Sequence, residues 1–328
     1  MTRIRFTSFV VALACAVATG LPGRAPAQSY PARPIHLVTG NPPGGATDVI
    51  ARTIGAPLGQ RLGQNVVIDN RPGSNGNISA ELAANAKPDG HTLLLGSDSL
   101  FGINPHLYSR MPVDLRKAFV PVTNLVTNML VLTVNPEKVP SKTLPEFIAF
   151  ARKANPPLFY ASIGNGSQHH IAMEMLKRQA KVNLTHVPYK GGGPAGIATV
   201  GGETVAMFGG GAVVPLVRSG KLRALAVTGT KRSPALPELP TIGDTYPGYA
   251  VTIWQGLFAP TGTPPEVIAK LRTEVQAVLK MPDVAQKLIN AGSGEPSLIS
   301  VEEFSAMIAA DFVRYGKTIK DTGIKVDN

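Results

Sequence analysis

An alternation of short apolar strands with helices constrains this chain more than any other feature. Residues 35–39, 65–69 and 91–96 have the composition of buried strands. Between them, apolar residues recur near helical spacing at 49–58 and 78–84. Strands that alternate with helices in this way predict a largely parallel sheet covered by helices on both faces.

The same alternation starts again in the middle of the chain. Strands are expected at 129–134, 158–162 and 225–227, with helices at 144–153 and 171–180. The chain has 328 residues, which fits two domains of about 100–200 residues each. We therefore predict an α/β protein with two domains, each a mostly parallel sheet flanked by helices.

The last part of the chain adds a strand at 254–259 and helices at 264–280 and 301–320. Thr263 and Ser300 each place a hydroxyl where a helix would begin, so both are predicted to act as N-caps. A glutamate follows Ser300 by three residues, which is the pattern of a capping box. These helices are expected to pack on the core as scaffold.

The predicted division of the chain follows from these two series. Domain 1 is expected to contain residues 28–126 and 255–328, and domain 2 to contain residues 127–254. A hinge is expected where strands pass between the domains, near 127–133 and 254–259.

The beginning of the chain has the order of a secretory signal peptide. Arg3 and Arg5 precede an apolar run at 6–18, and small residues follow at 25–27. The apolar run is shorter than the roughly 18 residues that a membrane-spanning helix needs. We predict that residues 1–27 are removed on export and that the mature protein is periplasmic.

Removal of this segment changes the composition. It takes away three arginines, no acidic residue and the one cysteine, so the formal net charge falls from +11 to +8. A mature chain without thiols has no disulfide, and burial of a core must stabilise it. One alternative stays open, because residues 12–15 loosely resemble a lipoprotein cleavage site that would place a lipid on Cys15.

The positive charge is spread along the chain, in runs no longer than two residues. Dispersed charge is typical of a solvated surface, so we expect no nucleic-acid partner. It can still attract anionic solutes over a distance. A binder of anionic polymers is kept as an alternative, whose affinity would fall steeply with salt.

Two glycine-rich loops each follow a strand and precede a helix, at residues 40–48 and 163–170. The start of a helix presents unpaired N–H groups and a partial positive charge, and glycine allows a ligand to approach the backbone. Each loop is therefore a candidate anion site, and two facing loops could hold one small acid. Ordinary strand-to-helix turns with simple N-caps are the alternative for each.

A third glycine-rich run, at 187–196, contains the pattern GxGxxG at Gly191, Gly193 and Gly196. No acidic residue stands about 20 residues further on to hold a ribose, which argues against a dinucleotide site. A ligand-binding loop that includes Tyr189 is the preferred interpretation, since tyrosine can stack on a ligand or donate a hydrogen bond to it.

Catalytic motifs are missing from the sequence. There is no G-x-S-x-G, no H-E-x-x-H and no complete Walker A motif. His169, His170 and His186 lack acidic neighbours at ligand spacing apart from Glu174. We expect no catalytic residue, no metal and no cofactor; the alternative is a secreted hydrolase that uses Ser167 and His170.

Several ordered motifs resemble the receptors of the tripartite tricarboxylate transporter family, often called the Bug family. The resemblance covers the whole mature chain. It is carried by these segments: Tyr30–Ile35, Pro42–Asp48, Asn70–Gly73, Pro88–Leu93, His186–Gly191, Gly220–Ala226, Leu236–Thr241 and Trp254–Pro260.

The resemblance implies a monomeric periplasmic receptor with a Venus-flytrap fold. Such a receptor captures a small carboxylate, which could be a dicarboxylate, a tricarboxylate or an aromatic acid, and delivers it to membrane permease subunits. The two glycine-rich loops would grip the ligand. The residues expected to bind it are Asn41, Pro43, Gly44, Gly45, Ala46, Thr47, Asp48, Ser162, Gly164, Asn165, Gly166, Ser167, His170 and Tyr189.

Departures from the family pattern leave the ligand open. Asn41 stands where relatives commonly have an aromatic residue, and Ser167 and His169 stand where threonine and proline are frequent. His170 matches the usual histidine. Without an aromatic wall at Asn41, that side of the binding site is expected to be wider or more polar.

Overall fold

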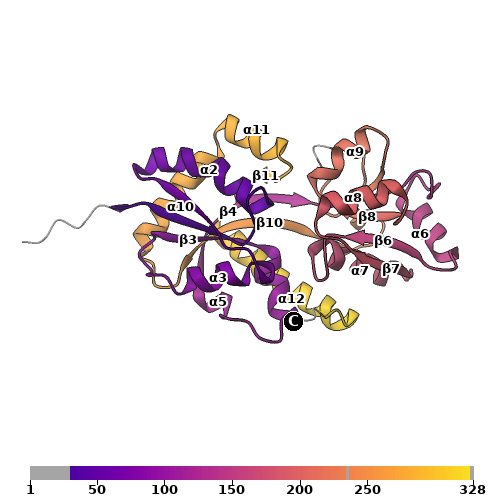
Figure 1. The fold of residues 1–328 in the computed structure, drawn as a ribbon, viewed down its shortest axis with the longest axis horizontal. Coiled ribbons are helices and arrows are strands. Elements are labelled where there is room, and N and C mark those ends of the chain that lie inside the picture. Colours follow the sequence, from indigo (N-terminus) through magenta and orange to yellow (C-terminus); the bar gives the residue numbers. More distant parts are fainter. Residues whose placement is uncertain (1–29, 234–235, 326–328) are drawn as a thin grey trace, which may run out of the picture.

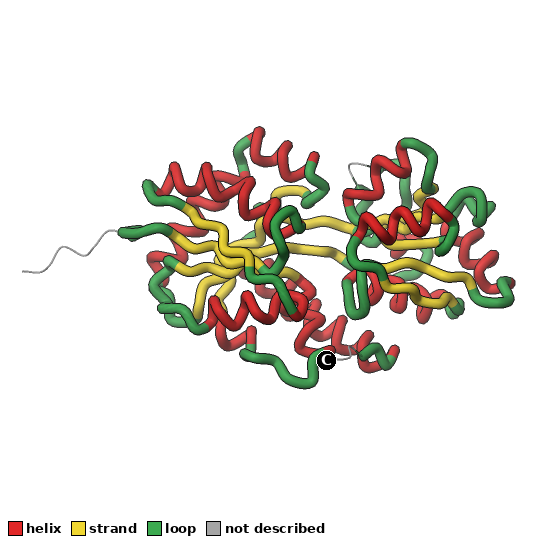
Figure 2. Tube along the Cα trace, in the orientation of Figure 1, coloured by secondary structure: helices red, strands yellow, loops and turns green. Residues whose placement is uncertain are grey.

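A computed structural model describes residues 30–233 and 236–325. The predicted signal peptide and Cys15 lie outside these residues. The chain forms two lobes that lie side by side (Figure 1), and each lobe contains one sheet with helices packed around it (Figure 2). In the described part of the chain, no helix is long and apolar enough to cross a bilayer.

The sheet of the first lobe has six strands in the order β11-β4-β10-β3-β1-β2. Parallel pairing joins β1 to β2 and β3, whereas β10 pairs antiparallel with β3 and β4, and β11 pairs antiparallel with β4. Four of the six strands therefore run in one direction. The strands are β1 (Ile35–Thr39), β2 (Val66–Asn70), β3 (Thr92–Ser97), β4 (Phe119–Met129), β10 (Thr252–Pro260) and β11 (Glu295–Pro296).

Helices cover both faces of this sheet because alternate strand residues bury on opposite sides. Leu93 and Leu95 share a cluster with α2, α10 and α11, whereas Leu94 lies with α3, α5 and α12. The helices are α2 (Ala46–Leu62), α3 (Asn77–Ala84), α4 (Asn104–Leu107), α5 (Leu115–Ala118), α10 (Pro265–Leu279), α11 (Pro282–Asn290) and α12 (Val301–Thr322), with the short turns η1 (Ser74–Gly76) and η2 (Ser99–Ile103).

The sheet of the second lobe has five strands in the order β7-β6-β8-β5-β9. Strands β7, β6 and β8 are parallel, and β5 pairs antiparallel with both β8 and β9, so four strands run in one direction. The elements are β5 (Val131–Val134), α6 (Leu144–Lys153), β6 (Leu158–Ser162), α7 (Gln168–Ala180), β7 (Leu184–Pro188), α8 (Gly192–Gly201), β8 (Ala206–Gly209), η3 (Gly211–Val213), α9 (Val214–Arg218), β9 (Arg223–Val227) and η4 (Ile242–Asp244).

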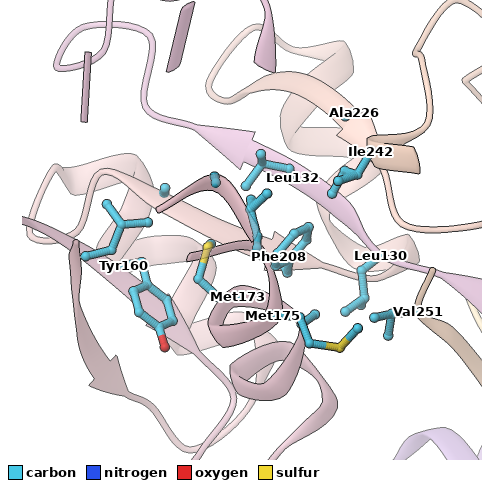
Figure 3. Close-up of a cluster of buried hydrophobic side chains, with 14 of the residues drawn as sticks. Leu130, Leu132, Tyr160, Met173, Met175, Phe208, Ala226, Ile242 and Val251 are labelled. Carbon is cyan, nitrogen blue, oxygen red and sulfur yellow. The ribbon is translucent and has the colours of Figure 1, made fainter. Parts of the chain in front are cut away.

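The core of the second lobe lies between its sheet and helices α6 and α7. Phe208 is fully buried among residues that include Leu130, Leu132 and Met175 (Figure 3). Tyr315 and Ile319 of α12 belong to the same cluster, whereas Phe304 near the start of α12 belongs to a cluster of the first lobe. The carboxyl half of α12 therefore packs against the second lobe and links the two.

The predicted α/β fold with two domains is confirmed, and most predicted elements lie within a few residues of their expected bounds. Strand β4 was missed except for Met129, because the predicted strand at 129–134 corresponds mainly to β5. The glycine-rich run at 187–196 differs from the expected loop, since β7 ends at Pro188 and α8 begins at Gly192. Ala195 of α8 packs against buried residues of the sheet, and this packing outweighs the low helix propensity of glycine.

The two predicted helix caps have different outcomes. Ser300 caps α12, and its capping box with Glu303 is present. The prediction for Thr263 is wrong, because the N-cap of α10 is Pro264 and has no side-chain cap. The Thr263 hydroxyl instead donates to the carbonyl of Pro260 at 2.8 Å.

Replacing Ser300 with alanine should lower the free energy of unfolding by about 1 kcal/mol, because the N–H of Glu303 at the start of α12 loses its acceptor. Ser305→Ala is the matched control, since Ser305 lies exposed in the same helix and bonds only to the carbonyl of Val301. Urea titration of both variants checks this. Equal stabilities of the two variants would contradict the role of the cap.

Candidate functional site

The direction of the strands brings both glycine-rich loops to the gap between the lobes. Strand β4 leaves the first lobe at its carboxyl end, and the chain enters the second lobe in β5. Strand β1 runs in the direction of β4, so loop 1 (residues 40–45) points toward the second lobe. Strand β6 runs opposite to β5, so loop 2 (residues 163–167) points toward the first lobe.

Loop 1 is held by hydrogen bonds within itself. The N–H of Gly45 donates to the carbonyl of Pro42 at 2.9 Å, and Gly44 has a positive φ of 82°. The side-chain oxygen of Asn41 accepts from the Thr47 hydroxyl at 2.6 Å and from the Thr47 N–H at 3.3 Å. Asn41 therefore covers part of the start of α2.

The buried carboxylate of Asp48 holds loop 1 in place. Asp48 is 2% exposed, and its carboxylate accepts from Arg52 at 2.9 Å, Asn70 at 2.9 Å and the N–H of Gly44 at 2.9 Å. The bond from the Arg52 guanidinium is the main cause that lowers the pKa of Asp48 to about 2. Asp48 is thus an ionised structural residue whose side chain is already occupied.

Two backbone donors are left at the start of α2. Among the described residues, the N–H groups of Ala46 and Asp48 have no hydrogen-bond acceptor. Pro43, Gly44 and Ala46 are exposed at this surface, whereas Thr47 is buried. The first predicted anion site is therefore smaller than the sequence suggested, because the loop itself uses most of its N–H groups.

A small polar cavity of about 70 Å³ adjoins loop 1. Asn41 and Thr47 contribute to its wall, and neither an acidic nor a basic side chain lines it. A volume of this size exceeds that of one water molecule. The residues of the wall that were not predicted are Gly40, Asn75, Gly76, Ser79, Leu95, Gly96, Ser97 and Leu100.

The turn between β2 and α3 supplies several of these unpredicted residues. Gly73, Ser74, Asn75 and Gly76 all have positive φ, and two of them are not glycine. Asn75 is held there by Asn104, to which its amide donates at 2.7 Å. The succession of turn residues at 71–76 was a signal in the sequence, since the loop after β2 must lie at the same sheet edge as loop 1.

Loop 2 is also closed by its own side chains. Gly164 and Gly166 have positive φ, of 135° and 70°. The hydroxyl of Ser162 accepts from the N–H of Gly164 at 3.1 Å, and that of Ser167 donates to the Gly164 carbonyl at 2.7 Å. Asn165 lies exposed at the tip. At the start of α7, the N–H groups of Gln168 and His169 have no acceptor among the described residues.

Two stacked histidines support loop 2. His170 and His186 have ring centroids 3.8 Å apart, and Nδ1 of His170 accepts from the N–H of Gly166 at 3.1 Å. Nε2 of His186 lies 2.6 Å from the Ser162 hydroxyl. Burial lowers the pKa of His170 to about 3 and that of His186 to about 4, so both rings are neutral at pH 7.

Tyr189 lies next to loop 2 through its backbone. Its N–H donates to the carbonyl of Ser162 at 3.0 Å. Its hydroxyl bonds to Glu203 at 3.2 Å on the exposed surface. The ring is half-buried against the cluster that contains Ala195 and Leu216. In this conformation the hydroxyl therefore bonds to a surface residue and not to loop 2.

The arrangement required for the alternative hydrolase is not present. The Ser167 hydroxyl contacts the backbone of Gly164 and His170, while the His170 ring is engaged with Gly166 and His186. Ser167 is therefore not paired with a base, as nucleophilic catalysis would need. Among the residues that the structure describes, no group of three or more His, Cys, Asp or Glu could hold a metal.

A larger groove of about 990 Å³ lies elsewhere, between the carboxyl half of α2 and the edge strand β2. Its wall includes Gly59, Gly63 and Gln64, which lie at the end of α2 away from loop 1. We assign the site to the loops because helix starts and buried polar groups converge there.

Two lobes joined by crossing strands, with glycine-rich loops facing the gap, define a binding protein of the periplasmic type. Comparison with known proteins identifies the family. Residues 50–324 match the model described as tripartite tricarboxylate transporter family receptor. The chain belongs to this family, and it is a solute-binding receptor, not an enzyme.

Three solved structures illustrate the relationship. One described as a periplasmic transporter is 36% identical, with a TM-score of 0.78 over 91% of this chain and 100% of that chain. The R. palustris protein Rpa4515 with adipate is 34% identical, with a TM-score of 0.79 over 90% and 99%. MatC from Rhodopseudomonas palustris with bound malate is 32% identical, with a TM-score of 0.74 over 88% and 100%.

The histidine stack predicts a loss of stability in acid. A folded-state pKa below the ordinary value means that the unfolded chain binds protons that the folded chain does not. Stability is therefore full above pH 6.5 and falls as the pH approaches 4. His186→Gln should remove the part of this dependence that His186 causes and leave the part from His170. The limit for one proton is about 1.4 kcal/mol per pH unit, and the partly exposed ring of His186 should contribute less than that.

Denaturant titrations of both proteins between pH 7 and pH 4 measure the effect. The difference in unfolding free energy between wild type and His186→Gln should shrink as the pH falls. A difference that stays constant over this interval would show that His186 titrates normally in the folded protein.

Proposed function

We propose that this receptor captures a small carboxylate in the periplasm, between loop 1 and loop 2, and delivers it to membrane permease subunits. The observation that carries the proposal is the pair of helix starts, α2 and α7, which point toward the gap from opposite lobes. Each retains N–H groups without an acceptor among the described residues. The adipate and malate complexes of related proteins support a carboxylate ligand.

The proposed site binds the anion without a cationic side chain. Arg52 is engaged by Asp48, and the histidines behind loop 2 are neutral at pH 7. Attraction then comes from the helix dipoles and from the N–H groups of Ala46, Asp48, Gln168 and His169. A charge at a helix start gains about 0.3–2 kcal/mol, so contributions from both lobes are needed for useful affinity.

The polar cavity next to loop 1 favours one class among the carboxylates. Its wall carries the amides of Asn41 and Asn75 and the hydroxyls of Ser79 and Ser97. Each of these groups already has a partner within the protein but can form further hydrogen bonds. Such a wall suits an aliphatic acid with a second polar group better than an aromatic acid, because an aromatic ring cannot use that remaining capacity. A dicarboxylate is therefore the preferred ligand.

Transport also requires the protein to open and close. We propose that residues 28–126 with 255–328 move as one domain, residues 127–254 as the other, and β4 and β10 bend between them. The closed monomer would present the surface that the permease recognises. We further propose export through a signal peptide at residues 1–27.

A panel of carboxylates should identify the ligand through thermal stabilisation. A compound at 100 times its Kd stabilises the folded protein by about 2.7 kcal/mol, which raises the melting temperature by a few degrees in a chain of this size. Aliphatic dicarboxylates should give the largest shifts. No shift with any mono-, di-, tri- or aromatic carboxylate would contradict the proposed function.

Gly166→Val should abolish carboxylate binding, because a β-branched side chain at positive φ distorts loop 2. Gly63→Val is the matched control: Gly63 has the same φ of 70° but ends α2, at the opposite end of the helix from loop 1. Both variants should lose similar stability. Calorimetric titration should show wild-type affinity only in Gly63→Val, and equal affinities would contradict the role of loop 2.

A further inference from the structure

One hydrogen bond connects the lobes beside the candidate site. The side-chain amide of Gln168, the first residue of α7, donates to Oδ1 of Asp98 at 2.9 Å. Asp98 directly follows β3, so it stands next to Ser97, which lines the polar cavity. The bond therefore joins the start of the helix behind loop 2 to the edge of the cavity beside loop 1.

The acceptor of this bond is unusual. Asp98 is 0% exposed, and no arginine or lysine forms an ion pair with it among the described residues. Its other oxygen accepts from the Tyr315 hydroxyl of α12 at 3.2 Å. The backbone of Ser99 supplies a further hydrogen bond to Asp98. A buried carboxyl without an ion-pair partner depends strongly on each of these bonds, because an unsatisfied polar group is costly.

The groups around Asp98 make it a weak acid. Burial, opposed by the bond from Gln168 and reinforced by nearby Asp311, raises the pKa of Asp98 to about 7. From α12, Asp311, Arg314 and Tyr315 face this region. Arg314 donates a hydrogen bond to Asp311 at 2.5 Å, and its charge also interacts with Asp98. The α7 side contributes the neutral amide of Gln168.

We propose that the hydrogen bond between Gln168 and Asp98 is a latch that holds the lobes together around the ligand and slows its release. Opening of the lobes would separate the two side chains, since they belong to opposite sides of the gap. Both are positioning residues, which set the distance between loop 1 and loop 2. The role in ligand release rests on the proposed function; the role in lobe closure does not.

The test compares wild type with Gln168→Ala and with Gln179→Ala, an exposed glutamine near the other end of α7. Malate and adipate are the probes, and stopped-flow measurement gives association and dissociation rates. Gln168→Ala should release the probe about tenfold faster with little change in association, as expected for one hydrogen bond. Gln179→Ala should match wild type.

Gln168→Glu adds a readout that a packing role would not change. At pH 8.5 two carboxylates face each other, so the probe should dissociate at least as fast as from Gln168→Ala. At pH 5.5 the pair shares a proton and the bond returns, so dissociation should approach the wild-type rate at that pH. Equal behaviour of this variant at both pH values would overturn the latch.

X-ray scattering of the unliganded proteins separates the latch from the proposed function. If wild type binds neither probe, the proposed function fails for these acids, and scattering decides about the latch. A larger radius of gyration in Gln168→Ala than in wild type and Gln179→Ala supports it. The latch would be overturned if Gln168→Ala released the probe at the wild-type rate. Where neither probe binds, an unchanged radius of gyration in Gln168→Ala would overturn it.

Discussion

The antiparallel pairing of β4 with β10 is the constraint on which the rest of the molecule depends. These strands pair from Phe119 to Met129, and both continue to the boundary of the second lobe. In the first sheet, β3 and β11 pair with them directly and β1 and β2 follow β3, so these two strands also set the edge at which each strand-to-helix loop of that lobe appears. Two loops that are more than 100 residues apart in the sequence therefore face the same gap. The buried Trp254 and Phe258 of β10 fix this pair in the core.

The loops at this gap keep their shape through polar contacts made within each lobe. In loop 1 the ionised Asp48 accepts hydrogen bonds from the N–H of Gly44 and from Arg52. In loop 2 the neutral His170 accepts one from the N–H of Gly166. A preformed loop loses less conformational entropy when a ligand binds. The cost is that fewer N–H groups remain for the ligand, which is why the described loops offer only a few donors each.

The sequence predicted elements with strong local signals and missed those that depend on packing. Helix 144–153 and strand 158–162 agree with the structure to the residue. Most of β4 was missed, because Pro121 and the polar residues Thr123 and Asn124 interrupt its apolar pattern. Glycine patterns located both loops, and the turn residues at 71–76 marked the loop that supplies Asn75 and Gly76. That this loop and Ser79 lie against loop 1, and that Asn70 bonds to Asp48, follow from tertiary contacts that no local pattern contains.

The neutrality of the proposed site has a consequence for transport. A carboxylate held by an arginine in a buried pair binds strongly, and separating the two leaves a charge without its partner. Helix dipoles and N–H groups each contribute about 1 kcal/mol, and here they are divided between two lobes. Opening the lobes would then remove about half of the contacts in one movement, and the ligand would leave without exposing an unpaired cation. In the proposed role, a receptor that releases its ligand to a permease would gain from this division, because its affinity would depend on closure rather than on any single group.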